Sequence, residues 1–178
     1  MVYHIYMNTK TIVLPKTNTH TLEYSLLTLS FFIPFLISGP QLLTGSVVNA
    51  LLFLFVSKTY SKKFLPIIVL PSLGALLNGV VFGTFTPFLL YFLPFIWISN
   101  FILVESFQYC FHKKSFAMGV VGSSIIKSLF LFTIAFVFTT TKFVPQIFLQ
   151  AMGIFQLGTA LLGGAIAFGI SNINSKKV

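Results

Sequence analysis

The feature that most constrains this chain is a series of six long apolar runs, separated by short polar segments. The runs are Leu22–Ser38, Leu42–Ser57, Phe64–Gly83, Pro87–Val104, Phe116–Phe138 and Ile147–Ile170. A helix needs about 20 apolar residues to cross the hydrocarbon core of a bilayer. The series therefore predicts six transmembrane helices. The second run is short, and a re-entrant hairpin is the alternative interpretation of that run.

The composition excludes the other broad classes of protein. Of the 178 residues, 56% are hydrophobic and only 7% are charged, whereas a soluble domain has about 25% charged residues. Disordered chains are poor in apolar residues, so disorder is excluded as well. We expect an all-α, multi-pass protein of the cell membrane. Residues 1–21 would form a cytoplasmic or interfacial segment, residues 22–170 the transmembrane domain, and residues 171–178 a cytoplasmic tail.

The lysines predict the orientation of the helices, because short cytoplasmic loops are enriched in positive charge. With six crossings and a cytoplasmic N-terminus, nine of the eleven lysines fall on the cytoplasmic side. These are Lys10, Lys16, Lys58, Lys62, Lys63, Lys113, Lys114, Lys176 and Lys177. Lys142 falls outside and Lys127 lies within a helix. Both termini are therefore predicted to be cytoplasmic. Because the chain has no arginine and no clustered basic face, we expect no nucleic-acid binding.

Polar side chains recur at helical spacing in five of the runs, which predicts that they face other helices or a cavity instead of lipid. The candidate substrate-binding residues are Gln41, Asn49, Asn78, Trp97, Asn100, Ser123, Lys127, Gln150 and Gln156. At about 1.5 Å per residue, Asn49, Lys127 and Gln156 fall near the bilayer midplane and Asn100 a little deeper, whereas Gln41 and Gln150 fall near the outer surface. The pattern predicts a polar funnel that opens outward. For the individual amides, hydrogen bonds between helices remain the alternative.

Lys127 is the most specific single feature of the sequence. It lies near the middle of its apolar run, where an inserted lysine costs about 2.5–3.5 kcal/mol. The only carboxylates of the chain, Glu23 and Glu105, are predicted near the cytoplasmic ends of their helices. We therefore hypothesise that Lys127 meets an anionic group of a ligand, such as a carboxylate. A solvated or neutral lysine without a role is the alternative.

Catalytic and metal-binding patterns are missing from the sequence. The chain has no aspartate, and its three histidines fall in predicted cytoplasmic segments. One cysteine, Cys110, excludes both a disulfide within the chain and a multi-cysteine metal site. Metalloprotease, nucleophile-elbow and phosphate-loop motifs do not occur. We therefore expect neither enzymatic activity nor a cofactor.

The architecture resembles the substrate-capture subunits, or S components, of energy-coupling-factor vitamin transporters. The likeness lies in the length, the six helices, the cytoplasmic ends, the outward funnel and the missing ATPase motif, over about residues 22–170. The segments 39–45, 70–75 and 156–160 are similar in texture to membrane proteins of that general kind. The resemblance implies capture of a vitamin or a similar small molecule at the outer face. It also implies a membrane coupling subunit and two cytoplasmic ATPases as partners.

Three functions remain open at the level of sequence. The leading hypothesis is a membrane subunit that captures a small nutrient, vitamin-like and with an anionic group as the favoured case, for import. The second is a small carrier or channel that works alone. The third is a membrane assembly protein without a ligand.

Overall fold

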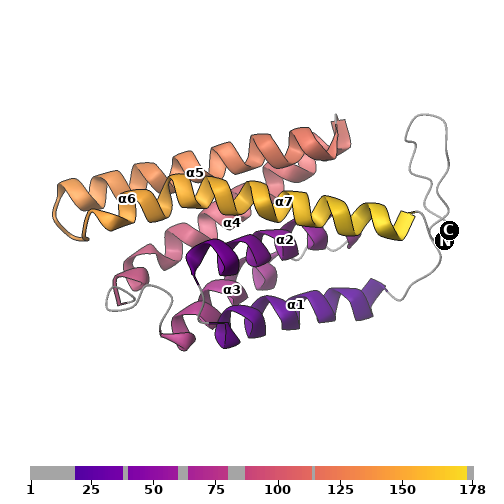
Figure 1. The fold of residues 1–178 in the computed structure, drawn as a ribbon, viewed down its shortest axis with the longest axis horizontal. Helices are drawn as coiled ribbons and strands as arrows, with labels where there is room; N and C mark the ends of the chain where they lie inside the picture. The colour runs from indigo at the N-terminus through magenta and orange to yellow at the C-terminus, as the bar shows by residue number, and fades with distance from the viewer. Residues whose placement is uncertain (1–18, 38–39, 60–63, 80–86, 114, 176–178) are drawn as a thin grey trace.

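The computed structural model describes residues 19–37, 40–59, 64–79, 87–113 and 115–175, and nearly all of them are helical. The helices are α1 (Thr19–Leu36), α2 (Gln41–Lys58), α3 (Leu65–Asn78), α4 (Leu89–Lys113), α5 (Phe116–Thr140), α6 (Ile147–Met152) and α7 (Ile154–Ser175). They run along one long axis, with α1 and α5 at opposite edges of the bundle and α7 between them (Figure 1). The described residues contain no strand, so the prediction of an all-α fold is confirmed.

Four segments of the described chain are long and apolar enough to cross a membrane. They are α2, residues Leu89–Phe111 of α4, α5, and Ile147–Asn172, which covers α6 and most of α7. Helix α3 is a shorter apolar helix of 14 residues, and α1, with 18 residues, is not among the four. These lengths and compositions are those of a membrane protein. The count of six crossings remains a prediction.

Local sequence explains where α3 and α5 begin and end. Helix α3 has a proline in its first turn, where the missing N–H costs no hydrogen bond. It ends at Asn78, before the predicted Gly83, because Gly79 adopts the left-handed conformation that closes many helices, with φ of 75°. Helix α5 begins after Ser115, whose hydroxyl accepts a hydrogen bond from the backbone N–H of Met118 at 3.3 Å.

The last apolar run is interrupted, although the sequence predicts one continuous helix. At Gly153 the backbone leaves the helical conformation, with φ −100° and ψ −99°, and this break separates α6 from α7. A Cβ atom at this position would approach the carbonyl oxygen of Leu149 to 2.7 Å and a ring carbon of Phe132 to 2.9 Å. The glycine therefore lets the chain pass close to both. Helix α7 then continues to Ser175, into the predicted cytoplasmic tail.

Several predictions concern residues outside the described part of the chain. Most of the N-terminal segment 1–21 lies there, as do residues 176–178. The lysines at positions 10, 16, 62, 63, 114, 176 and 177 lie there as well. The structure therefore places only the remaining four lysines, and the positive-inside orientation stays a prediction.

Small residues bring α2 and α7 into close contact. A Cβ atom on Gly163 of α7 would lie 2.6 Å from the carbonyl oxygen of Ser46 and 2.7 Å from the backbone nitrogen of Ala50, both on α2. Gly45 of α2 faces the side chain of Thr159 of α7 in the same way. Side chains larger than hydrogen would separate the two helices at these points. This proximity places Asn49 of α2 beside Thr159.

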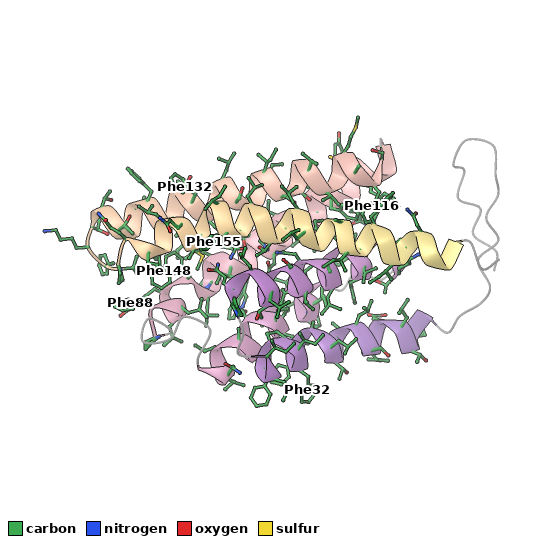
Figure 2. The ribbon with its side chains drawn as sticks, viewed as in Figure 1. Phe32, Phe88, Phe116, Phe132, Phe148 and Phe155 are labelled. Atoms are coloured by element: carbon green, nitrogen blue, oxygen red, sulfur yellow. The ribbon has the colours of Figure 1, made fainter. Side chains whose placement is uncertain are left out.

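Two apolar clusters occupy the two ends of the bundle. The termini-side cluster contains the second half of α2 together with Ile67, Leu103, Phe107 and Val120, at the end where α1 begins and α7 finishes. The α6-side cluster is rich in phenylalanine. Its residues are Leu89, Phe92, Leu131, Ala135, Val144, Phe148 and Met152. Figure 2 shows Phe88 and Phe148 near the α6 end, with ring centroids 6.1 Å apart, and Phe116 toward the opposite end. Buried polar residues lie between the clusters.

Candidate functional site

Lys127 is buried in the middle of the bundle, with 3% of its surface exposed. Its Nζ donates hydrogen bonds to Oδ1 of Asn49 at 2.7 Å and to Oδ1 of Asn100 at 2.8 Å. The three residues lie near the middles of α5, α2 and α4, respectively. The structure thus brings together three residues that the sequence predicted at similar depth. We call this group the lysine cage.

The orientation of both asparagine amides follows from their other hydrogen bonds. Nδ2 of Asn100 donates to the carbonyl oxygen of Ile68 at 3.1 Å, and a carbonyl oxygen can only accept. Nδ2 of Asn49 donates to Oγ1 of Thr159 at 3.2 Å, and the Thr159 hydroxyl in turn donates to the backbone oxygen of Gln156 at 3.1 Å. Both amide oxygens must therefore face the lysine. They present the negative ends of two dipoles to its nitrogen, which favours the ammonium form.

The cage supplies dipoles but no carboxylate. Glu23 is half-buried near the start of α1, and Glu105 is exposed on α4; neither lines the cavity around Lys127. A buried ammonium without a counter-ion is costly, and two amide oxygens compensate only part of the lost hydration. An ammonium has three N–H groups, and the cage uses two of them. The third is available to a group inside the cavity.

A cavity of about 100 Å³ lies next to the lysine cage, and each of the seven described helices contributes to its wall. Its polar lining residues are Gln41, Thr44, Asn49, Ser72, Asn100, Lys127 and Gln156. The remaining lining residues are small or apolar: Pro34, Gly45, Val48, Pro71, Ala75, Leu89, Ile96 and Met152. The volume is several times the roughly 30 Å³ of a water molecule in the liquid. It is smaller than the roughly 300–1,000 Å³ of pockets for drug-sized ligands.

Thr44 gives the cavity an unpaired polar group. Its side chain is 5% exposed, and its Oγ1 has no hydrogen-bond partner among the described residues. Ser46, two residues further along α2, donates to the carbonyl oxygen of Leu42 at 2.6 Å, as helical serines commonly do. A buried polar atom without a partner costs about 1–3 kcal/mol. The Thr44 hydroxyl would therefore gain from a hydrogen bond, but its oxygen has almost no accessible surface, so a bound molecule would reach it only after the side chain rotates.

Gln156 and Gln41 lie at the same end of the cavity as Thr44. The half-buried side chain of Gln156 has no hydrogen bond to the described residues, so its amide is free to act as donor and acceptor. Nε2 of Gln41 donates to the carbonyl oxygen of Ala151 at 2.8 Å and so ties the start of α2 to α6. At 1.5 Å per residue, Thr44 precedes Asn49 by about 7.5 Å along the axis of α2, so it lies at a different level of the cavity from the lysine cage. We call Thr44 and Gln156 the upper polar pair.

Four of the predicted site residues lie outside the cavity lining. Nδ2 of Asn78 donates to the carbonyl oxygen of Phe35 at 2.7 Å, and the hydroxyl of Ser123 donates to the carbonyl oxygen of Val120 at 3.2 Å. Gln150 is exposed on α6. Nε1 of Trp97 donates to Oγ of Ser72 at 2.6 Å. Trp97 therefore acts on the cavity only through Ser72, which lines it.

The candidate site predicted from sequence omitted three polar residues that the structure includes. Thr44 and Ser72 line the cavity, and Thr159 holds Asn49 in place. Thr44 lies at helical spacing from Gln41, and that spacing was the signal that could have identified it. The apolar residues of the cavity wall could not be identified from the sequence, because similar side chains occur throughout every helix.

The lining residues can bind a molecule, and Lys127 is the one titratable side chain among them. The cavity wall contains no carboxylate, imidazole or thiol. Within the described part of the chain, no group of three His, Cys, Asp or Glu side chains is placed to hold a metal ion. The arrangement offers one cationic donor, several neutral hydrogen-bonding groups and an apolar wall. No family model, curated protein or solved structure matches the chain.

Proposed function

We propose that this chain is a multi-pass protein of the cell membrane that captures a small solute with an anionic group in the cavity beside Lys127, for import. The observation that carries the proposal is a buried lysine with one unused N–H beside a cavity lined by several polar side chains. A purely structural lysine would need no cavity, and a dry packing defect would have an apolar lining. The polar lining with one cation fits a site for a negatively charged molecule.

Six crossings with both ends in the cytoplasm fit the arrangement of the helices. If α6 and α7 count as one, the described helices form six segments, and α1 begins at the end where α7 finishes (Figure 1). Lys58 and Lys113 are the last residues of α2 and α4, which finish at that same end. The positive-inside rule makes this end cytoplasmic. The upper polar pair and α6 then face the outer side, from which the solute would enter.

Partners follow from the resemblance to S components. Such a subunit would bind its solute alone and would need a membrane coupling subunit and two cytoplasmic ATPases for transport. Affinity purification of the full chain from mild detergent, followed by protein mass spectrometry, tests this part. Recovery of ATPase subunits in fixed ratio supports it. Solute uptake by the chain alone in liposomes contradicts it.

A carrier that works without partners is the second candidate function. The segments beginning at Gln41 and at Gln156 share a Gln-Leu-x-Thr pattern, and both glutamines line the same cavity from adjacent helices. Two matching elements around one site are typical of carriers with internal repeats. With only three matching positions, this support is weaker than that for the capture subunit. Liposome uptake distinguishes the two.

Direct detection of the retained solute tests the capture site. The full chain is purified in lipid nanodiscs, and small molecules released on denaturation are identified by mass spectrometry. We expect an anionic compound with the wild type and with Lys142→Met, which removes an exposed lysine of the α5–α6 loop. We expect its loss with Lys127→Met. Equal retention by Lys127→Met would contradict the proposal.

A further inference from the structure

The charges around the cavity limit the ligand to a single negative charge. Lys127 is the one cationic side chain of the lining, and only one of its N–H groups is unused. The amide oxygens of Asn49 and Asn100 flank that N–H, and they would repel further negative charge. The lining contains no carboxylate, so a cationic or zwitterionic solute would leave its ammonium unpaired. These constraints exclude dianions, amino acids and polyamines.

The upper polar pair requires a second, uncharged polar group on the ligand. The Thr44 hydroxyl and the Gln156 amide can each donate and accept a hydrogen bond. The group that satisfies both should therefore also donate and accept, as a hydroxyl does. It would lie away from the ammonium, because Thr44 precedes Asn49 on α2 by about 7.5 Å at 1.5 Å per residue.

The wall between the two polar levels is mainly apolar, and the hydroxyl of Ser72, which also lines the cavity, is already bonded to Val69 and Trp97. Val48, Ile96 and Pro71 line the cavity and belong to three different helices. Because these side chains offer no hydrogen bond, the portion of the ligand that connects its two polar groups should be hydrocarbon. The volume of about 100 Å³ restricts that portion to a short chain.

We infer that the cavity binds short hydroxy monocarboxylates, with the carboxylate on Lys127 Nζ and the hydroxyl on Gln156 and on Thr44, whose side chain would rotate to turn its buried oxygen toward the ligand. This inference rests on the proposed function and adds the class of solute. It also assigns separate roles to two levels of the cavity. The lysine cage would recognise the charge, and the upper polar pair would distinguish a hydroxy acid from its unsubstituted counterpart.

Calorimetric titration of the full chain in nanodiscs tests the inference with defined probes. The hydroxy acids are lactate, 3-hydroxybutyrate and 4-hydroxybutyrate, and the unsubstituted acids are propionate and butyrate. For the wild type we expect the best hydroxy acid to bind about tenfold more tightly than its unsubstituted counterpart, as one additional hydrogen bond would give. Thr44→Val should remove that preference without weakening the unsubstituted acid. Thr44→Ser should restore it.

The controls separate failure of this inference from failure of the proposed function. Ser46→Ala removes a buried hydroxyl of α2 that bonds to its own helix and lies outside the cavity lining, so it should leave the preference unchanged. Lys127→Met should abolish binding of all five acids.

If Lys127→Met abolishes binding but Thr44→Val has no selective effect, the class of solute is wrong and the capture site stands. If the wild type binds none of the hydroxy acids, the inference is overturned, while the retained-solute experiment still decides the proposed function. Equal binding by wild type and Lys127→Met contradicts both.

Discussion

The two polar levels of the cavity differ in how completely their hydrogen bonds are satisfied. In the lysine cage, both asparagines use donor and acceptor atoms, in bonds of 2.7–3.2 Å. In the upper polar pair, neither Thr44 nor Gln156 has a side-chain partner among the described residues. The satisfied level holds α2, α4, α5 and α7 together without a ligand. Because one level is satisfied by the chain itself and the other is not, substitutions should affect the stability of the two levels in opposite directions.

The largest effect on stability is expected from Asn100→Leu in the lysine cage. The change removes the hydrogen bond to Lys127 and the one to the carbonyl oxygen of Ile68, and it leaves the buried ammonium with one partner. Hydrogen bonds to charged groups are worth about 1.5–3 kcal/mol. We expect the free energy of unfolding, measured in mixed detergent micelles, to fall by about 2–3 kcal/mol. Gln150→Leu, at an exposed amide, is the control and should change it by less than about 0.5 kcal/mol.

A smaller loss of stability is expected from Gly163→Ala, which disturbs the packing of α2 against α7 that supports the lysine cage. The added methyl group would collide with backbone atoms of Ser46 and Ala50, so α2 and α7 must separate. Separation lengthens the bond between Asn49 and Thr159. We expect the free energy of unfolding to fall by about 1–2 kcal/mol, typical of overpacked cores. Gly158→Ala is the matched control, because its Cβ would meet no atom within 4 Å. An equal loss in both variants would contradict close packing as the cause.

At the upper polar pair, Thr44→Val is expected to stabilise the empty protein. Valine has nearly the shape of threonine and removes a buried hydroxyl that has no partner. We expect the free energy of unfolding to rise by about 1 kcal/mol, which is the lower end of the cost of an unsatisfied group. The comparison with Ser46→Ala is informative, because that hydroxyl is paired and its removal should be neutral or destabilising. A loss of stability in Thr44→Val would show that its hydroxyl is paired, through water for example, and would remove the contrast between the levels.

The sequence placed the members of the lysine cage at similar depth, but it did not predict that Asn49 and Asn100 accept hydrogen bonds from Lys127. Helical spacing, together with the depth counted along each helix, placed Asn49, Asn100 and Lys127 near a common level. Polar groups buried among apolar helices have few hydrogen-bond partners other than one another, so residues at the same depth tend to meet. The same reasoning included Gln150, which is exposed on α6. Gln150 precedes the break at Gly153, so the spacing that relates it to Gln156 in a continuous helix does not hold, and one glycine in an apolar run gives no sign of such a break. The length of α3 was overestimated for a related reason, since apolar residues continue past Gly79.

The smallest effect on stability is expected from Gln41→Leu at the edge of the cavity. This variant tests whether the attachment of α6 to α2 through Gln41 controls access to the upper polar pair. Nε2 of Gln41 bonds to the carbonyl oxygen of Ala151, but the glutamine is half-buried, so the bond competes with water. We expect the free energy of unfolding to fall by less than about 1 kcal/mol, the net value of an ordinary hydrogen bond. Ligand release should accelerate more than stability falls, because α6 loses its attachment to α2 beside the upper polar pair. Stopped-flow release of a bound hydroxy acid measures this. Unchanged release would mean that the packing of Met152 and Phe148, both fully buried, holds α6 without the glutamine.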